Sequence, residues 1–231
     1  MVKLVAAELS REAEEYLEAI YKLQERSGVA RTKELARELK VVPGSVTNTI
    51  AHLERHGLVE HTPYRGVRLT AEGERLALSI IRRHRLAERL LTDLLEADWS
   101  GVHETACRLE HALTEDVVAL LERRLGYPRF CPHGNPIPRE SGETEEVECF
   151  PLTAAEENQA CVVVRLVDER RETLASLAAL GIRPNVLVRV IRATQKRLVL
   201  HVAGKKRSIS QEEAEGIWVK PAEVEETDVP K

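Results

Sequence analysis

The apolar residues of this chain change their spacing along its length. They recur with the period of an amphipathic helix over residues 9–26, 32–39, 45–56, 71–98 and 101–125. From Cys161 onward they form short runs rich in β-branched residues, at 162–167, 186–191, 198–202 and 216–219, with one short helical segment at 172–179. Because a helix-period pattern does not fold as a strand, we expect a mainly α-helical chain with small β parts and a small C-terminal barrel.

A stretch rich in Pro and Gly separates the two patterns. It contains the segment CPHGNPIP at 131–138 and an acidic run at 143–148. This composition is typical of a linker. We interpret Cys131 and His133 as linker residues as well, because two candidates in a loop do not make a four-ligand structural zinc site.

The length of 231 residues suffices for three small domains, each with its own core. We expect a DNA-binding head over residues 1–74 and a helical domain over 75–138. A linker at 139–150 then leads to a C-terminal domain over 151–231.

The first three helical segments have the outline of a helix-turn-helix. Ser10 can cap the first segment and Gly28 ends it, whereas residues 41–44 (VVPG) break the chain before the third. In this motif the second helix of the pair enters the major groove by its N-terminal end. We therefore expect Ser45, Thr47 and Asn48 to contact base edges.

Two short strands follow the third helical segment. Residues 58–61 and 67–70 have strand character, and the turn at 63–66 (PYRG) joins them through a basic tip. Such a hairpin after a helix-turn-helix is a wing. The candidates for phosphate contacts are Arg31, Thr49, Tyr64 and Arg65.

The two long helical segments, 71–98 and 101–125, carry apolar stripes without DNA-binding character. Helices of this kind beyond a winged helix-turn-helix commonly build a two-fold dimer, which presents two recognition helices to a palindromic operator. The expected partners are therefore double-stranded DNA and a second copy of this chain.

Charge and cysteine usage restrict the other partners. With 34 Lys+Arg against 38 Asp+Glu, the net charge is -4, so any nucleic-acid surface must be a local patch. The four cysteines have neither CxxC spacing nor the density of a disulfide scaffold, which suits a reducing cytosol. The apolar start at residues 1–7 is too short for a signal peptide and no run has membrane-spanning length, so we expect a cytoplasmic protein that does not use a membrane.

Four side chains that can bind a metal lie within nine consecutive residues of one expected helix. They are His103, Cys107, Glu110 and His111. At about 100° per residue they fall within an arc of about 100°, so one helix face would present imidazole, thiolate and carboxylate together.

One helix upstream, His84 and Glu88 share a face through their i, i+4 spacing. Two such helices packed together can hold two ions. The alternatives are a solvated pair at His84 and Glu88 and a buried structural thiol at Cys107.

Several strings resemble the diphtheria toxin repressor family of metal-dependent regulators. They are YLEAIY at 16–21, RHRLAERLL at 83–91, VHETACRLEH at 102–111 and GNPIP at 134–138. The resemblance implies a winged-helix domain, a helical dimerisation and metal domain, and a C-terminal SH3-like barrel. The function that it implies is metal-dependent repression of metal-uptake genes by a homodimer.

The resemblance also implies two sets of metal ligands. Cys107, Glu110 and His111 correspond to the primary site, whereas His84, Glu88 and His103 correspond to the ancillary site. The barrel adds ancillary ligands in some relatives, and the nearest carboxylate here is Glu172.

The first helix is implied to complete the primary site. Iron-responsive members have a methionine at the position of Glu15, whereas manganese-responsive members have an acidic residue there and a glutamate one turn later, which matches Glu18. A carboxylate in place of a thioether makes the site harder and favours Mn(II), although Cys107 retains one soft ligand that suits Fe(II). We therefore favour Mn(II) and place Fe(II) second. Glu15 and Glu18 could instead be the polar side of an amphipathic helix.

A metal ion held by the first helix and by the dimer-domain helix would fix the spacing of the two heads. Metal affinity and operator affinity would then be reciprocally coupled, and metal-free protein would bind the operator weakly.

Two other functions remain open. His103-Glu104 followed by Cys107 is similar to the HExxH of zinc peptidases, but the second histidine is missing and Glu110 would crowd the open position of a catalytic zinc. We therefore do not expect an enzyme. A winged-helix regulator that senses an organic ligand is the second alternative, and titration of metal-free protein with Mn(II) and Fe(II) separates it from a metal sensor.

Overall fold

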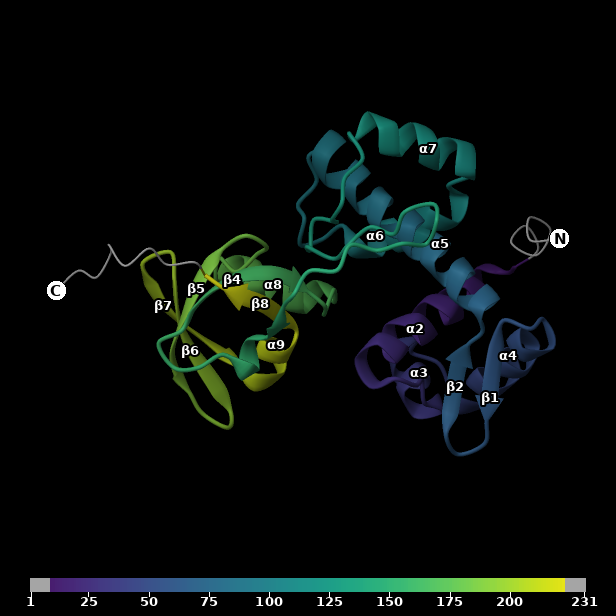
Figure 1. Ribbon diagram of the computed structural model, residues 1–231, viewed down its shortest axis with the longest axis horizontal. Coiled ribbons are helices and arrows are strands. Elements are labelled where there is room, and N and C mark those ends of the chain that lie inside the picture. The colour runs from purple at the N-terminus through teal and green to yellow at the C-terminus, as the bar shows by residue number, and fades with distance from the viewer. Residues whose placement is uncertain (1–8, 223–231) are drawn as a thin grey trace. The chain divides into compact units, whose positions relative to one another are not determined.

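The computed structural model describes residues 9–222, and the chain divides into two compact units. The first unit contains Met1–Arg83 with Pro138–Glu143, and the second contains His84–Ile137 with Thr144–Lys231. Figure 1 labels the helices and strands of both units.

Three helices form the body of the first unit: α2 (Arg11–Ser27), α3 (Thr32–Glu38) and α4 (Pro43–Arg55). The Ser10 hydroxyl caps α2 by accepting from the backbone N–H of Ala13 at 3.2 Å, and Gly28 ends the helix at φ 74°. The apolar faces of the three helices meet in one core that includes Leu17, Leu35 and Ile50. The expected three-helix arrangement is confirmed.

The helix-turn-helix and the wing also occur at the expected positions. α4 begins at Pro43, two residues before Ser45, because proline suits the first turn of a helix, where its missing N–H is not needed. β1 (Val59–Thr62) and β2 (Gly66–Leu69) pair antiparallel. The backbone N–H of Arg65 donates to Thr62 across the turn, so the tip of the wing is closed.

The helix after the wing, α5 (Ala71–Arg89), is shorter than the expected 71–98. Its last turns widen into a π-helical turn at Leu90–Leu94, and the unit boundary falls within α5, after Arg83. α5 therefore contributes residues to both units.

The expected helix over 101–125 is interrupted, which corrects the sequence prediction. α6 (His103–Leu109) continues into a 3-10 turn at Glu110–Ala112, and α7 (Glu115–Arg124) starts afterwards. Leu113 between them is extended, at φ -81° and ψ 110°. His103, Cys107, Glu110 and His111 thus do not share one continuous α-helical face.

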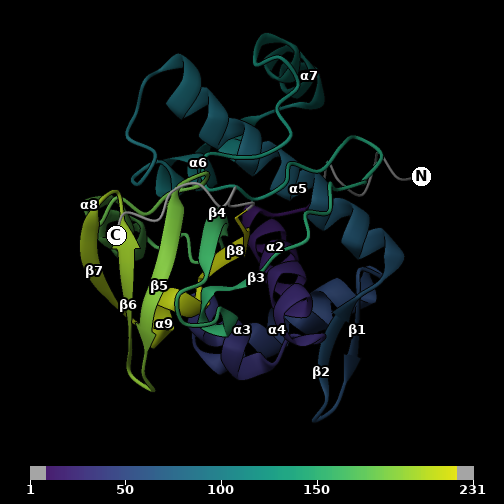
Figure 2. The same cartoon turned by 60° about the vertical axis from the view of Figure 1, so that its left-hand side comes forward.

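The second unit ends in a six-stranded antiparallel sheet of order β3-β8-β4-β5-β6-β7 (Figure 2). The strands are β3 (Phe150–Pro151), β4 (Ala160–Leu166), β5 (Leu187–Ala193), β6 (Arg197–Val202), β7 (Lys205–Ser210) and β8 (Ile217–Pro221). Helices α8 (Arg171–Ala179) and α9 (Gln211–Glu215) lie between strands in the sequence. One core contains Leu166, Leu174, Val190, Leu200 and Ile217, as the expected small barrel requires.

Within the described part of the chain, none of the helices combines the length and the apolar character needed to cross a membrane.

Candidate metal centre and DNA-binding face

His84 and Glu88 lie one turn apart on α5, and both side chains are buried. Nε2 of His84 is 3.1 Å from Oε1 of Glu88, as expected for the i, i+4 spacing. Nδ1 of His84 is 2.6 Å from Oε2 of Glu110. The His84 imidazole is therefore held between two carboxylates.

His103 from α6 and Glu169 from the segment before α8 complete a first ligand group. Nδ1 of His103 lies 3.1 Å from Nε2 of His84, 3.4 Å from Oε1 of Glu88 and 3.6 Å from Oε2 of Glu169. One ligand atom from each of these four residues lies within 4.8 Å of the others. This convergence of imidazole nitrogens and carboxylate oxygens is typical of a site for a divalent ion.

The carboxylate that comes from the barrel is Glu169, whereas Glu172 was expected. α8 begins at Arg171, so Glu172 lies in its first turn and points its side chain to solvent. Glu169 precedes the helix, is 9% exposed and accepts a hydrogen bond from Nδ2 of Asn135 at 2.8 Å. The structure therefore brings Glu169 to the cluster and leaves Glu172 outside it.

The interpretation of Cys131 and His133 as linker residues is wrong. Both are buried, and the loop around them is ordered by hydrogen bonds from the backbone of Cys131 to Asn135 and from Leu166 to His133. Gly134 sits at φ 84°, and a Cβ there would lie 2.1 Å from the Val164 carbonyl oxygen. The loop is thus fixed against β4.

Cys131 and His133 form a second ligand group with Glu88 and Glu169. Nδ1 of His133 lies 3.1 Å from Oε1 of Glu88 and 3.7 Å from Oε1 of Glu169. All four residues are buried, and their ligand atoms lie within 4.8 Å of one another. The two groups share Glu88 and Glu169.

The charges within the cluster shift its pKa values. Burial lowers the pKa of His103, but its bonds to Cys107 and Glu88 raise that pKa overall to about 9. Burial also opposes protonation of His133, yet the charge of Glu88 raises its pKa to about 12. Burial raises the pKa of Glu88, but the charges of His133 and His84 hold it well below its ordinary value. Without metal, the cluster is therefore imidazolium against carboxylate, and a bound ion would replace the protons.

The surroundings of two atoms, Oε2 of Glu88 and Nδ1 of His133, indicate whether these residues fit a metal ion. Oε2 of Glu88 is buried and has no hydrogen-bond partner within residues 9–222, which is costly unless a ligand satisfies it. Nδ1 of His133 faces Glu88 without hydrogen-bonding geometry, while its Nε2 donates to the Trp99 carbonyl oxygen at 2.9 Å. A ring nitrogen anchored on a backbone carbonyl is typical of metal-ligating histidines. The residues present fit a divalent cation.

The expected primary ligands Cys107, Glu110 and His111 lie in the second unit. Cys107 groups with His84 and His103, with its Sγ 3.7 Å from Nε2 of His103. Burial raises the pKa of Cys107, but the two imidazoles lower it overall, which favours the thiolate. Oε1 of Glu110 lies 3.4 Å from Nε2 of His111.

Glu15 and Glu18 lie on α2 in the first unit. Oε1 of Glu15 is 3.1 Å from Nε of Arg11, and Oε1 of Glu18 is 2.9 Å from Nζ of Lys22. Glu18 is buried, and Glu15 is partly exposed. Both carboxylates have a cation one turn away on the same helix.

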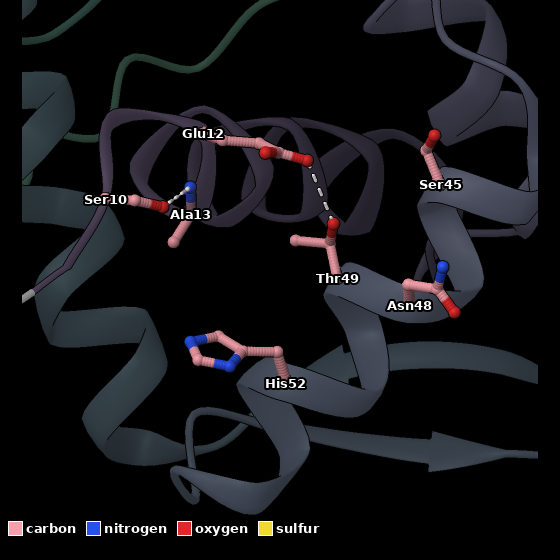
Figure 3. A pocket seen from close by; sticks show the side chains of 7 residues that line it. All are labelled: Ser10, Glu12, Ala13, Ser45, Asn48, Thr49 and His52. Carbon is pink, nitrogen blue, oxygen red and sulfur yellow. Dashed lines mark hydrogen bonds between the residues drawn. The ribbon is translucent and has the colours of Figure 1, made fainter.

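The expected base-reading residues lie on the outer side of α4. Figure 3 shows Ser45, Asn48, Thr49 and His52 along this helix, beside the first turn of α2, where they line one pocket with Ser10, Glu12 and Ala13. The Thr49 hydroxyl donates to Oε1 of Glu12 at 3.0 Å. Thr47 is exposed but bonds back to the Pro43 carbonyl oxygen. The sequence analysis did not identify Glu12 and His52. His52 lies at i+7 from Ser45 and at i+3 from Thr49, and this helical spacing would have indicated it.

The expected phosphate contacts are on the surface of the first unit. Tyr64 is fully exposed at the tip of the wing with Arg65 beside it, and Arg31 is exposed before α3 with its guanidinium 3.8 Å from Glu34. Exposed basic and aromatic side chains next to a recognition helix suit contacts to the DNA backbone.

The fold and these sites define a winged-helix DNA-binding protein with a buried cluster of metal ligands and an SH3-like C-terminal domain. Three family models match the chain in that order. The iron dependent repressor N-terminal DNA binding domain matches residues 8–67, and the iron dependent repressor metal binding and dimerisation domain matches residues 70–139. The FeoA domain matches residues 150–221.

The chain is similar to known proteins over most of its length. It is 32% identical to the diphtheria toxin repressor of Corynebacterium efficiens over 198 residues, which cover 81% of this chain and 86% of that protein. It is 42% identical to the diphtheria toxin repressor of Corynebacterium glutamicum over 125 residues, 54% of this chain and only 55% of that protein, so it spans about half of the latter's length. The solved structure of a manganese-dependent transcriptional repressor in complex with manganese has a TM-score of 0.84 and 30% identity, and the match covers 91% of this chain and 100% of that one.

The chain belongs to the diphtheria toxin repressor family of metal-dependent, DNA-binding transcriptional repressors. This membership confirms the resemblance seen in the sequence and the three-part fold. The family is not enzymatic, so the zinc-hydrolase alternative does not apply.

Proposed function

We propose that this chain is a homodimeric repressor of metal-uptake genes that binds a palindromic operator when loaded with Mn(II), with Fe(II) as the second metal. The observation that carries the proposal is the buried cluster around Glu88, whose Oε1 lies within 3.4 Å of three imidazoles. A cluster of this charge and burial is expensive to keep without an ion, which favours a metal-binding role over a purely structural one.

The ligand chemistry supports Mn(II) first. The group of His84, Glu88, His103 and Glu169 offers two imidazoles and two carboxylates, a hard set that suits Mn(II). Cys107 and Cys131 stand beside it as soft ligands that suit Fe(II), which is why we keep iron as the second metal. The structural relative named above binds manganese, whereas the matching family models are described as iron dependent.

The protein's own residues would link metal binding to shape. The cluster collects side chains from α5, from α6, from the loop at 131–133 and from the segment before α8. A bound ion would supply positive charge that replaces the protons of His103 and His133 and holds these four segments together. Asn135 and the Trp99 carbonyl would keep Glu169 and His133 oriented toward it.

We also retain the primary set as part of the proposal. Glu15 and Glu18 from the DNA-binding head, with Cys107, Glu110 and His111 from the dimerisation domain, would couple metal affinity to operator affinity. By linkage, operator DNA should then raise the metal affinity by the same factor as metal raises the DNA affinity.

The experiment is anaerobic calorimetric titration of metal-free protein with Mn(II) and with Fe(II), followed by DNA binding to a duplex selected by the Mn(II)-loaded protein from a random library. We expect the affinity for Mn(II) to exceed that of exposed carboxylates on a helix surface. The selected duplex should be bound only when metal is present. Glu15→Met should move the preference toward Fe(II), whereas Glu25→Met, on the exposed side of the same helix, should not. Equal affinity for the selected duplex with and without metal would overturn the proposal, and no metal binding at all would favour a regulator that senses an organic ligand.

A further inference from the structure

Positive charge is concentrated on three strands of the barrel, outside the winged-helix domain. Residues 187–210, which form β5, β6 and β7, contain seven Lys or Arg residues and no Asp or Glu, in a chain of net charge -4. Their sequence also contains no Phe, Trp or Tyr. This segment is therefore a local basic patch in an acidic protein.

The register of the strands places four of the seven cations on one face of the sheet, whereas Lys205 and Arg207 pair with the buried Val202 and Leu200 on the other face. Arg189 pairs with His201, and His201 pairs with Lys206, so the three form a row across β5, β6 and β7. Arg192 lies opposite Val199 in the next row along. The other face carries Val190, Leu198, Leu200 and Ile209, which are buried in the barrel core. We call the outward side, with Arg189, Arg192, Arg197, His201 and Lys206, the basic face.

The side chains of the basic face are exposed to solvent. All five residues are exposed, and within residues 9–222 Arg189, Arg192 and Lys206 form no ion pair. Arg189 donates to the Asn158 carbonyl oxygen, and Arg197 donates to the Ser208 hydroxyl, so these two guanidinium groups are partly oriented. With neighbouring strands about 4.8 Å apart, one row spans about 10 Å.

We infer that the basic face is a second DNA-binding surface, which contacts the phosphate backbone without reading sequence. Duplex DNA carries about one negative charge per 1.7 Å of its axis, so exposed cations such as Arg189, Arg192 and Lys206 can each contact a phosphate. The absence of aromatic side chains and the mainly cationic character favour backbone contacts over base stacking or base reading. The inference rests on the function proposed above only in that the same chain binds DNA.

An acidic polypeptide is the competing occupant of the basic face. The acidic run of this chain is a poor candidate for that role. In the acidic run at 143–148, Glu145 is already paired with Arg129. Duplex DNA, by contrast, is the ligand that the family to which this chain belongs binds.

The test uses the full-length protein and a labelled duplex of mixed sequence, with anisotropy measured between about 50 and 200 mM salt. The variant is Arg189→Gln with Arg192→Gln and Lys206→Gln. The matched control removes the same charge from exposed positions elsewhere, as Arg123→Gln with Arg124→Gln and Arg171→Gln. Each series is measured with Mn(II) and with chelator.

We expect the basic-face variant to bind about tenfold more weakly or worse, and the slope of log K against log salt to shrink by about 2 to 3, since each phosphate contact contributes about 0.9. The control should behave as wild type. Lys206→Gln alone, on the edge strand β7, should lower the slope by about 1 and serves if the triple variant does not fold.

Affinity and slope equal to wild type in the basic-face variant would overturn the inference, as would an equal loss in the control. Competition by polyglutamate as effective as competition by DNA of the same charge would also overturn it, in favour of an acidic polypeptide. If metal leaves the wild-type affinity for the selected operator duplex unchanged while the two triple variants still differ on mixed-sequence DNA in chelator, the proposed function fails and the basic face stands.

Discussion

Oε1 of Glu88 lies 3.1 Å from Nε2 of His84 and 3.1 Å from Nδ1 of His133. One carboxylate on α5 therefore faces an imidazole from its own helix and another from a loop that the sequence alone suggests is a linker. Like Glu169, it belongs to both four-residue ligand groups, so both groups depend on it.

Glu88→Gln should lower the affinity for Mn(II) by at least about 100-fold, because loss of a direct ligand should exceed the 10- to 100-fold typical of outer-shell partners. It should also destabilise the metal-free protein by about 3 kcal/mol, since it leaves buried imidazoles without their carboxylate. Calorimetry and urea unfolding measure the two effects. Glu74→Gln, exposed on the same helix, should change neither, and near-wild-type metal affinity in Glu88→Gln would rule out the cluster as a metal site.

Metal binding should release protons, and metal affinity should rise with pH. The pKa of His103 is about 9 in the metal-free protein and its ordinary value is 6.5, so the protonated ring stabilises the fold below 6.5 and that stabilisation is lost as pH rises toward 9. The metal competes with the same proton, so its affinity should increase over this window. Calorimetry in buffers of different ionisation enthalpy counts the protons, and a heat that is independent of the buffer would contradict the prediction.

Gly134→Ala should unfold or loosen the second unit, by about 3 kcal/mol or more. The new Cβ would lie 2.1 Å from the Val164 carbonyl oxygen, and φ is 84°. Gly204→Ala is the matched control, because Gly204 has φ 78° with open space around it and should cost only about 1 kcal/mol. Thermal unfolding compares the two, and equal losses would show that the contact with β4 has no energetic weight.

Glu12→Gln should strengthen DNA binding by a few fold. The carboxylate lies beside Ser45, Asn48 and Thr49, where it would repel phosphates, and the amide retains an acceptor for the Thr49 hydroxyl (Figure 3). Anisotropy titrations with metal-loaded protein measure the change. Glu25→Gln, away from this face, is the control, and weaker DNA binding by Glu12→Gln would mean that Glu12 orders Thr49 for the complex rather than opposing DNA.

The periodic parts of the fold were predictable, and the elements with mixed signals were not. The helices at α2, α3 and α4 follow apolar stripes and clear breaks, so the pattern located them. The sequence pattern did not predict β7, because Lys205, Lys206 and Arg207 interrupt the apolar alternation of a strand. Such charges are common on edge strands, and β7 is an edge strand. The break before α7 had a local signal in Thr114 followed by Glu115 and Asp116, a typical helix start, but the apolar stripe on both sides outweighed it.

The metal cluster was only partly predictable because half of it is assembled by the fold. His84 and Glu88 share one helix, so their spacing predicts contact. The loop that carries Cys131 and His133 and the segment that carries Glu169 lie far from each other and from Glu88 in the sequence, where spacing carries no information about distance. Glu169 differs from the predicted Glu172 because the start of α8 at Arg171 turns the latter outward. The close approach of Gly134 to β4, together with the hydrogen bonds from Arg89 to the Phe130 carbonyl oxygen and from Leu166 to the His133 carbonyl oxygen, holds the loop residues near Glu88.

That close approach has a consequence for the modular view of this protein. The family models divide the chain into a metal domain at 70–139 and a FeoA domain at 150–221, yet the ligand group of Glu88, Cys131, His133 and Glu169 takes residues from both. In a chimera that carries the barrel of a relative, the 131–137 loop would pack against a barrel of different sequence. The unit that keeps this ligand group intact therefore comprises α5, the 131–137 loop and the barrel.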